Sequence, residues 1–565
     1  MRERRESLTC QAENSYTLGM RFWHRASFAL EKKRSRTMFI LICLFAFTFS
    51  FNPVQFEGAH KPNDNNKLIL RIGTSNRVRS ANIFLDSYMS VFAQLSNPPL
   101  MKMQPDGKII GQIAQDISVS PDYKRWEFSI REDLYWNDGA PVTAEDIKFT
   151  IEYIRDKSPV AGWMKDIMDT VSISGEKTVV LELRRPYTRL DVEMATHRLL
   201  PKHIWKAVEN PMQYTNSGDN VGCGPFFIQK IDLNRGVIRF AKNPFWKGPK
   251  PRIDAVELHI YQNIDVLSLA LDRGDVDVFY DYASSYPYQN LKILRTNSRF
   301  DFIEKLSTGL TFLGLNLGKA PMSDQAFREA LSFAIDYGEI IKLNSLGYGK
   351  VPNRGFIPPS FEYYKETTPL EFNPGRARQI LDDSGYIDQN DDGIREDHHG
   401  KELSLILLVR PTHVRLAELI RDYLQAVGVK ITIKNVDTST WISLKDRYRY
   451  DLVIARTTPW GMIMHAGWAT GYFDSRRTGE GVLHNIDDPA FLELCDDLLS
   501  TRNQDELRAS AFKLQDYYSR NLPAIPLYWN VFITPFHKKF QGWITNPLYG
   551  IFNIDNFLNL RPTAQ

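Results

Sequence analysis

The 565-residue sequence predicts an α/β protein with mixed sheets in more than one domain. A chain of this length has room for about two to four domains with large cores. After residue 60, strand-like and helix-like segments alternate irregularly, without the strict strand-helix-strand order of an all-parallel sheet, and this order favours mixed sheets. The composition, with 43% hydrophobic and 24% charged residues, is typical of a globular chain.

The clearest local prediction is a strand, a turn and a capped helix. Residues 126–130 alternate apolar and polar side chains, which indicates a strand with one apolar face. The Asn-Asp-Gly run at 137–139 has the chemistry of a tight turn. Thr143, followed three residues later by Asp146, then predicts the capped start of a helix.

Similar patterns predict elements along the rest of the chain. Residues 414–427 repeat apolar side chains at the spacing of one buried helix face, and residues 430–435 alternate as a strand. Further elements are expected as strands at 67–72, 171–173 and 179–183, and as helices at 324–337, 374–384 and 504–521.

Residues 1–59 are predicted to be a leader that contains a signal peptide. Residues 32–36 are basic, and residues 38–51 form an unbroken run of apolar and small hydroxyl side chains. This run is shorter than the roughly 20 residues of a stable membrane anchor, which favours a cleaved signal peptide. Cleavage is expected near Gly58 and Ala59, and Met20 or Met38 are alternative start sites.

The leader also accounts for the positive charge of the chain. It holds nine Lys or Arg residues and five Glu residues, whereas the whole chain has a formal net charge of +3. The remainder is close to neutral, so charge gives no reason to expect a nucleic-acid partner.

Two cysteines, Cys223 and Cys495, lie beyond the leader. In an oxidising compartment they can form one disulfide, whereas two cysteines far apart in sequence are more often separate buried thiols. The sequence leaves both alternatives open.

Five ordered blocks carry a more specific pattern. They lie at 123–153, at 222–254 with the runs GCGPFF, NPFW and KPRID, at 273–277 with RGDVD, at 315–336 with REAL and AID, and at 381–430 with DDGIR and GVK. Together these blocks resemble the extracellular solute-binding protein family 5, the substrate-binding proteins of peptide and nickel ABC importers.

The resemblance implies a bilobal periplasmic-binding-protein type II fold with mixed sheets, two hinge strands and an extra subdomain in the first lobe. In such a fold the ligand is held between the lobes, and hinge closure expels water. We expect the first lobe at 60–103, 222–306 and 526–565, the extra subdomain at 104–221 and the second lobe at 307–525.

The resemblance also implies a function. The chain would be the substrate-binding component of an ABC importer that captures a peptide or peptide-like ligand in the periplasm and delivers it to permease subunits in the inner membrane. A nickel or other metal-chelate binding protein of the same family is the alternative, and a secreted hydrolase is the alternative of another class. A monomer without a cofactor and without a nucleic-acid partner is expected.

The choice between peptide and chelate depends on residues 456–468. In oligopeptide binders of this family, an aspartate near the cleft edge of the second lobe pairs with the peptide ammonium. Here no carboxylate lies between Asp451 and Asp474, and a buried ammonium without a partner is costly. The segment, which opens with Arg456, is more similar to that of nickel-chelate binders. His465 would then offer an imidazole nitrogen to a chelated metal, or it is an ordinary packed or exposed histidine.

Other ligand contacts are expected from aromatic and arginine side chains. Trp460 and Trp468 would form apolar walls or stack on the ligand. Arg198 aligns with an arginine that holds chelator carboxylates in nickel binders, since a guanidinium pairs with a carboxylate through two hydrogen bonds. A surface ion pair is the alternative for Arg198. The full expected ligand-binding set is Arg198, Tyr280, Tyr282, Tyr286, Arg456, Trp460, His465 and Trp468.

Part of the sequence resembles a calcium-binding loop. Asp388, Asn390, Asp392 and Gly393 fit the first positions of an EF-hand loop, but His399 replaces the bidentate glutamate at its end. A hairpin turn without a metal is the alternative.

Catalytic motifs give no support to an enzyme. Residues 314–319 match a phosphate-binding loop only in part, and the sequence contains neither an H-E-x-x-H nor a G-x-S-x-G motif. The sequence therefore predicts a binding protein.

Overall fold

The structure is a computed structural model that describes residues 67–85, 89–158, 161, 163–215, 220–282, 284–457 and 488–563. The leader predicted at 1–59 lies outside these residues. Residues Lys67–Gln565 form one compact unit. Within the part of the chain that is described, no helix has the length and apolar character needed to cross a membrane.

One mixed sheet contains most of the described strands. They are β1 (Ile69–Thr74), β8 (Phe226–Asp232), β9 (Val237–Lys242), β10 (Ala255–Ile260), β11 (Val278–Phe279), β12 (Phe300–Leu315), β13 (Gly349–Lys350), β14 (Ser404–Val409), β15 (Lys430–Asn435), β16 (Leu452–Arg456) and β17 (Ala524–His537). Their order is β15-β14-β16-β12-β17-β11-β1-β10-β9-β8, and β13 pairs with β17. The sheet is mixed because β1 runs parallel to β10 and β11, whereas β9 and β17 run antiparallel to their neighbours.

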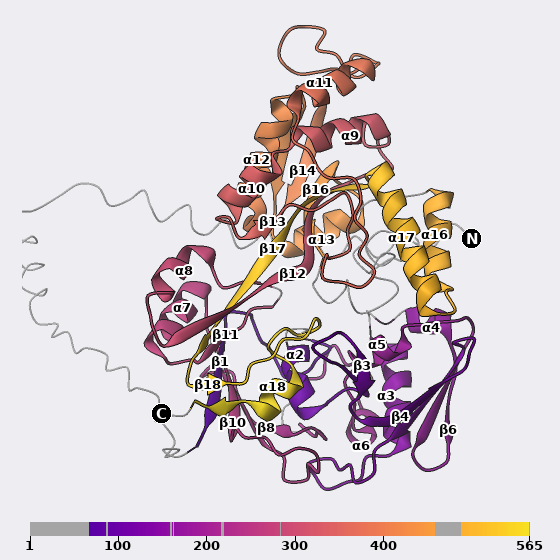
Figure 1. Ribbon diagram of the computed structural model, residues 1–565, viewed down its shortest axis with the longest axis vertical. Coiled ribbons are helices and arrows are strands. Elements are labelled where there is room, and N and C mark those ends of the chain that lie inside the picture. Colours follow the sequence, from indigo (N-terminus) through magenta and orange to yellow (C-terminus); the bar gives the residue numbers. More distant parts are fainter. Residues whose placement is uncertain are drawn as a thin grey trace, which may run out of the picture. The chain divides into compact units, whose positions relative to one another are not determined.

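β12 and β17 connect the two halves of this sheet. They run antiparallel, from Phe300 opposite His537 to Gly314 opposite Ala524. The end of β12 also pairs with β16, whereas Phe536 near the end of β17 pairs with β11. Both strands therefore belong to both halves, as Figure 1 shows, and they are the two hinge strands of a bilobal fold. We call the half with β1 and β8–β11 the first lobe and the half with β14–β16 the second lobe.

A smaller antiparallel sheet forms the extra subdomain of the first lobe. Its strands are β4 (Ala114–Val119), β5 (Arg125–Ile130), β6 (Met168–Ser174) and β7 (Thr178–Leu183), in the order β4-β5-β7-β6. Trp126, Phe128 and Ile130 are buried on one face, as the alternation predicts. Helix α3 (Ala144–Lys157) begins with the predicted capping box of Thr143 and Asp146. The predicted strand, turn and helix are confirmed.

The remaining elements of the first lobe are short. They are the helices α2 (Met89–Ser96), α4 (Trp163–Ile167), α5 (Leu190–Met194), α6 (Lys202–Trp205), α7 (Ile264–Arg273), α8 (Tyr288–Leu294) and α18 (Ile554–Asn559), with the strand pairs β2 (Met101–Met103) and β3 (Ile109–Gly111), and β18 (Phe540–Gln541) and β19 (Arg561–Pro562). The strand expected at 67–72 is β1.

Helices cover the second lobe. They are α9 (Gln325–Ala334), α10 (Tyr337–Asn344), α11 (Pro374–Asp383), α12 (Val414–Gln425) after the 3-10 turn η1 (Pro411–His413), α13 (Thr438–Asp446), α16 (Pro489–Leu499) and α17 (Gln504–Asn521). The elements expected at 374–384, 414–427, 430–435 and 504–521 are α11, α12, β15 and α17.

The single helix expected at 324–337 is wrong, because the structure has two helices there. α9 ends at Ala334, and Ile335 has extended backbone angles. Asp336 then starts α10, since its side chain accepts the backbone N–H of Glu339. The apolar pattern continues through this break, which explains why the periodicity predicted one helix.

A close backbone contact fixes the predicted GCGPFF run against α2. A Cβ atom on Gly224 would lie 2.2 Å from the carbonyl oxygen of Leu95, and one on Gly222 would lie 2.3 Å from that of Ser96. Cys223, between these glycines, is buried, as is Cys495, and the two are separate thiols. Of the two alternatives for the cysteines, the structure has separate buried thiols.

Candidate ligand-binding site

A cavity of about 420 Å³ lies along the hinge strands. β12 contributes Ile303 and residues 305–308, and β17 contributes Phe532 and Thr534. The first lobe contributes residues 279–281, Ser284 and the loop 545–552, together with Pro105 and Asp106 of the extra subdomain; Ser360 comes from the second lobe. A pocket of a few hundred cubic ångströms between lobes is typical of a site for a small ligand.

The hinge strand β12 changes its pairing where it borders the cavity. The register between β12 and β17 shifts between Leu306 and Leu310, so the intervening residues bulge out of the ladder. Ser307 Oγ accepts the Gly309 N–H at 3.0 Å, and the Leu310 N–H donates to Thr457 Oγ1 at 2.8 Å. The bulge therefore turns Ser307 and Thr308 into the cavity wall.

Asparagine side chains hold the loop 545–552 in place. The backbones of Asn546 and Gly550 exchange two hydrogen bonds of 3.0 Å. Asn546 also accepts the Tyr549 N–H at 2.7 Å and donates to the Met103 carbonyl at 3.1 Å, while Asn553 donates to the Gly550 carbonyl at 2.8 Å. This wall is thus organised before any ligand binds, which lowers the entropy cost of binding.

Asp281 is the most enclosed carboxylate of the cavity. Its Oδ1 accepts the Ser75 N–H at 2.7 Å and the Thr74 hydroxyl at 3.0 Å, and its Oδ2 accepts the Ser75 hydroxyl at 2.5 Å. Burial raises the pKa of Asp281, and these hydrogen bonds oppose that effect. Asp281 therefore ties the end of β1 to the segment after β11.

Lys305 places a positive charge in the same cavity. Its side chain is exposed to the cavity, but surrounding protein atoms partly desolvate it, and this burial lowers its pKa. The site therefore combines a carboxylate, an ammonium, hydroxyls and apolar walls.

The three tyrosines expected at the ligand occupy different places. Tyr280 lines the cavity, where its ring packs edge-on against Phe92 and Phe552 at centroid distances of 4.9 and 4.8 Å. Tyr282 is half-buried outside the cavity lining, and its N–H donates to Asn76 Oδ1. Tyr286 is buried behind the wall, against Phe279.

The two arginines expected at the ligand lie one layer behind the wall. Arg198 is buried, and its Nη2 donates to the Tyr549 hydroxyl at 2.6 Å while its guanidinium lies 5.3 Å from that ring. Arg456 lies 5.8 Å from the ring of Phe532, and burial lowers its pKa. Both arginines thus touch residues that line the cavity. Trp460, His465 and Trp468 lie outside the described residues.

His197, next to Arg198, supplies a pH dependence. Burial, assisted by the Arg198 charge, lowers the pKa of His197 from 6.5 to about 4. Above pH 6.5 the ring is neutral in both states; as pH falls toward 4, only the unfolded chain gains the proton, so stability is lost. We expect this residue to contribute a loss of about 2 kcal/mol between pH 7 and pH 5. Urea unfolding from pH 7 to pH 5 should show a smaller loss of unfolding free energy for His197→Gln than for the wild type. The control His399→Gln, at an exposed histidine, should lose as much as the wild type. The same loss in all three proteins would contradict this role of His197.

The loop expected to resemble a calcium site is a turn in which the side chains accept backbone N–H groups of the loop itself. Asp388 Oδ2 accepts the Gly393 N–H at 2.9 Å, and Asn390 Oδ1 accepts the Asp392 N–H at 2.9 Å. Glu396 accepts the Gln389 N–H at 2.8 Å. Among the residues described, no group of three or more His, Cys, Asp or Glu side chains is placed to hold a metal ion.

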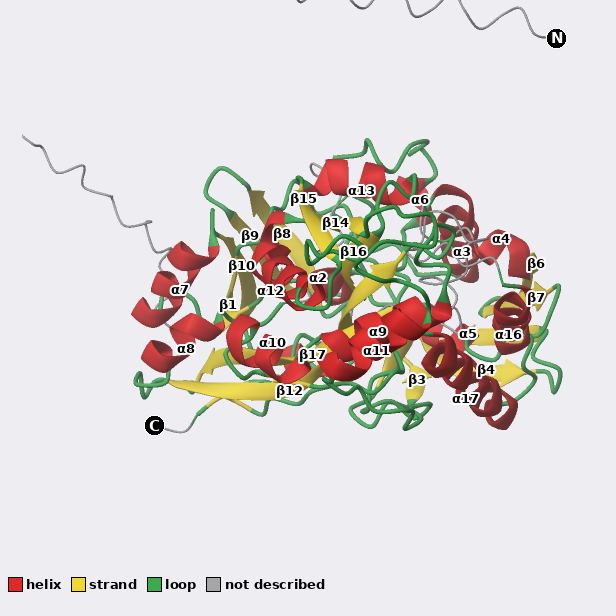
Figure 2. Cartoon of the chain, turned by 90° about the horizontal axis from the view of Figure 1, so that it is seen from above, coloured by secondary structure: helices red, strands yellow, loops and turns green. Residues whose placement is uncertain are grey.

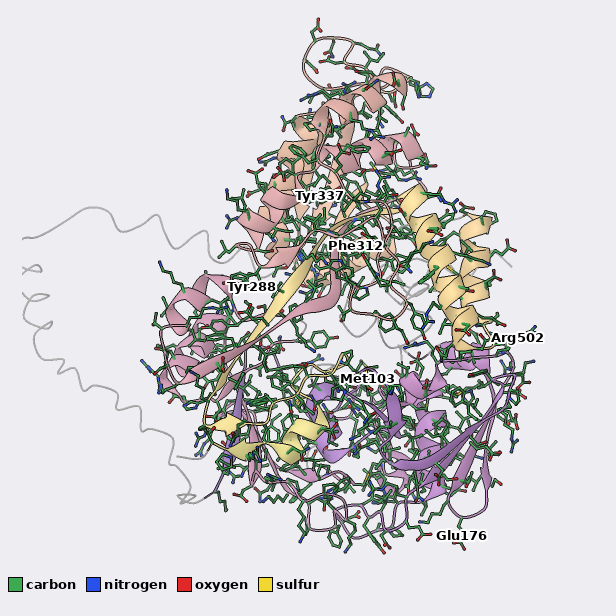
Figure 3. The ribbon with its side chains drawn as sticks, in the orientation of Figure 1. Met103, Glu176, Tyr288, Phe312, Tyr337 and Arg502 are labelled. Carbon is green, nitrogen blue, oxygen red and sulfur yellow. The ribbon has the colours of Figure 1, made fainter. Side chains whose placement is uncertain are left out.

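The extra subdomain contacts the second lobe through Arg189. This buried guanidinium donates to the Tyr363 hydroxyl at 3.0 Å, lies 3.6 Å from Glu362 Oε1 and stacks over Phe361. We call the contacts of Arg189 with residues 361–363 the clasp. Figures 1 and 2 show α16 and α17 beside α4 and α5, and Figure 3 labels Arg502, between α16 and α17, where these helices meet the extra subdomain.

Breaking the clasp should weaken ligand binding. A bilobal protein binds tightly only in its closed form, and loss of a charge-assisted contact between lobes lowers the population of that form. We expect Arg189→Met to raise the ligand Kd about tenfold, measured by calorimetry. The exposed Arg184 of the same subdomain gives the control, because Arg184→Met should leave the Kd unchanged. Equal affinity of Arg189→Met and wild type would show that the clasp does not contribute to closure.

Sequence reasoning missed several residues of the cavity. Asp281 stands directly between the predicted Tyr280 and Tyr282, and this carboxylate amid aromatic residues was a usable signal. Lys305 and Phe532 lie on strands whose pairing brings them together, and no local pattern predicts that pairing.

The hinge strands and the cavity between lobes define this chain as a two-lobed ligand-binding protein. Residues 108–479 match the family of bacterial extracellular solute-binding proteins, family 5 Middle, and the chain belongs to that family.

Individual relatives agree with this assignment. The chain is 24% identical over 378 residues to the nickel-binding periplasmic protein of Escherichia coli, covering 66% of this chain and 71% of that protein. It is 22% identical over 455 residues, 79% of this chain and 84% of the relative, to an Escherichia coli protein described as "Probable D,D-dipeptide-binding periplasmic protein DdpA". The fold is similar to that of a periplasmic oligopeptide-binding protein from Thermotoga maritima, with a TM-score of 0.76, 20% identity and coverage of 88% of this chain and 100% of the other.

Proposed function

We propose that this chain is the periplasmic binding component of an ABC importer and that its cargo is a short peptide. The observation that carries the proposal is the cavity at the hinge, which presents an acidic group and a basic group in one apolar-walled space. A peptide is a zwitterion with a polar backbone, so it can use both charges and the hydroxyl groups of the lining. The peptide-binding relative and the oligopeptide-binding structural neighbour support this choice.

A nickel chelate is the second candidate cargo, because one relative is a nickel-binding periplasmic protein. Nickel favours imidazole nitrogen as a ligand. Within the described residues the cavity lining contains no histidine, and His465 lies outside them. The described side chains therefore favour a peptide.

The remaining parts of the proposal follow from the family. The chain would be exported through the leader at 1–59, act in the periplasm and deliver its cargo to permease subunits in the inner membrane. We propose that it binds and releases the ligand without changing it chemically. Mass spectrometry of a bound peptide before and after incubation tests this point, since a shortened or modified peptide would identify an enzyme.

A thermal unfolding screen distinguishes the two cargoes. A ligand that binds only the folded state at one hundred times its Kd stabilises the protein by about 2.7 kcal/mol. We expect such a stabilisation from pools of di- to pentapeptides and none from nickel with histidine. Stabilisation by nickel with histidine alone would overturn the peptide assignment and favour the chelate.

A further inference from the structure

Lys305 is the basic group of the cavity wall, and it has no counter-charge among the described residues. The adjacent Glu304 pairs with Arg295. Asp281 accepts hydrogen bonds from Ser75 and Thr74, and Asp106 lies 3.4 Å from Lys108. None of these acidic groups pairs with Lys305, and no described carboxylate lies within ion-pair distance of its ammonium.

The surroundings of Lys305 make a missing partner costly. Its cross-strand neighbour is Phe532, and Ile303 and Leu306 also line the cavity. An ammonium beside apolar side chains loses part of its hydration, and only an anion or several acceptors can replace that hydration. Burial is the cause that lowers the pKa of Lys305, with no opposing charge.

Ser307 adds a hydrogen-bond donor beside this charge. Residues 305 and 307 lie two positions apart where the bulge of β12 begins, and both line the cavity. Ser307 is only 4% exposed, and its oxygen already accepts the Gly309 N–H. Its hydroxyl proton therefore remains to be donated, and within the described residues it has no acceptor.

We propose that Lys305 and Ser307 form the anion-binding site of this cavity and accept a carboxylate of the cargo. This inference rests on the proposed function, and it narrows the cargo to peptides that carry an accessible carboxylate. A charge-assisted hydrogen bond in a partly dry site is strong, so the pair selects for this group. The carboxylate can come from the free C-terminus of the peptide or from an acidic side chain, and the same two residues would bind either.

Three tetrapeptide pools test the proposal. The first pool has free C-terminal carboxylates and contains no Asp or Glu. The second is the same pool with C-terminal amides. The third also has C-terminal amides, and one of the four residues in each peptide is Glu. Apparent affinities come from the dependence of the unfolding midpoint on pool concentration. The variants are Lys305→Met, Lys305→Arg and Ser307→Ala, and Lys292→Met provides the control, because Lys292 is an exposed lysine on α8, outside the cavity lining.

The wild type is expected to bind one or both carboxylate-bearing pools more tightly than the amide pool. Lys305→Met should weaken that binding about 10- to 100-fold and leave the amide pool within about threefold of the wild-type value. Lys305→Arg should retain most of the preference, Ser307→Ala should lose part of it, and Lys292→Met should match the wild type. The pool that depends on Lys305 identifies the source of the carboxylate.

Equal binding of all three pools by the wild type would overturn the anion site while leaving the peptide function intact. An unchanged preference of Lys305→Met for the carboxylate-bearing pools over the amide pool would also overturn the anion site. Failure of every pool to bind would remove both the anion site and the peptide function. The unfolding midpoint of ligand-free Lys305→Met separates the effect on binding from a folding defect. It should equal or exceed the wild-type midpoint, because the variant removes an uncompensated charge. A clear decrease would show that Lys305 has a structural partner.

Discussion

Arg328→Met is expected to lower the free energy of unfolding by about 3–5 kcal/mol, one of the two largest effects that we predict. Arg328 on α9 is 5% exposed and donates to backbone carbonyls in two places. It reaches Met322 at 2.8 Å and Ser323 at 3.1 Å in the turn before α9, and Asn521 at 2.7 Å and Leu522 at 3.2 Å at the end of α17.

The reason is that the Arg328 guanidinium supplies the hydrogen bonds of these carbonyl oxygens. The last carbonyls of a helix, such as that of Asn521 in α17, have no N–H donor within the helix, and they carry the negative end of the helix dipole. Methionine fills the space of the arginine stem but offers no donor, so buried carbonyl groups are left unsatisfied. Urea unfolding measures the loss. Arg520→Met, in the exposed last turn of α17, is the matched control and should change stability by less than about 0.5 kcal/mol. A loss below about 1 kcal/mol for Arg328→Met would contradict this role.

Gly224→Ala should cost about 3 kcal/mol or more, because it inserts a methyl group into a contact between two backbones. The added Cβ would lie 2.2 Å from the Leu95 carbonyl oxygen and 2.8 Å from the carbon of that carbonyl. A side chain could rotate away from such a contact, whereas the backbone at the end of α2 can move only if the helix moves. The methyl group therefore separates α2 from the start of β8.

Gly375→Ala provides the control for this effect. Gly375 lies near the start of α11, and a Cβ atom there would meet only the Asn373 side chain, at 3.6 Å. Alanine should be neutral or stabilising by up to about 1 kcal/mol at this position. Thermal and urea unfolding of both variants give the comparison, and equal stabilities would show that the contact at Gly224 can relax.

Local signals predicted much of the fold. The capping box at Thr143 and the alternation in β5 are complete within a few residues, so no tertiary information was needed. The apolar stripe of α12 was equally clear. The break between α9 and α10 was missed although Asp336 carries a capping signal, because the apolar residues continue on both sides of it.

The site was harder to predict because its residues come from distant parts of the chain. Tyr280 was placed near the ligand through a resemblance, and the structure puts it in the cavity wall. Lys305 faces the cavity only because β12 pairs with β17 and then bulges, and this register is a tertiary property. The loop 545–552 joins the wall from the end of the chain, held in part by Asn546, whose side chain bonds the Met103 carbonyl far away in sequence. Patterns of local hydrophobicity contain none of this information.

Distance measurement between the lobes by single-molecule fluorescence tests the central claim most directly. One label would replace the exposed Glu176 in the turn between β6 and β7, and the other the exposed Asp391 of the second lobe. When the tetrapeptide pool with free C-terminal carboxylates is bound, the distance between the two labels should become shorter and its distribution narrower. The reason is that bending at hinge strands β12 and β17 closes the cavity over its ligand. Ligand binding with an unchanged distribution would contradict a clamp that works by closing on its cargo.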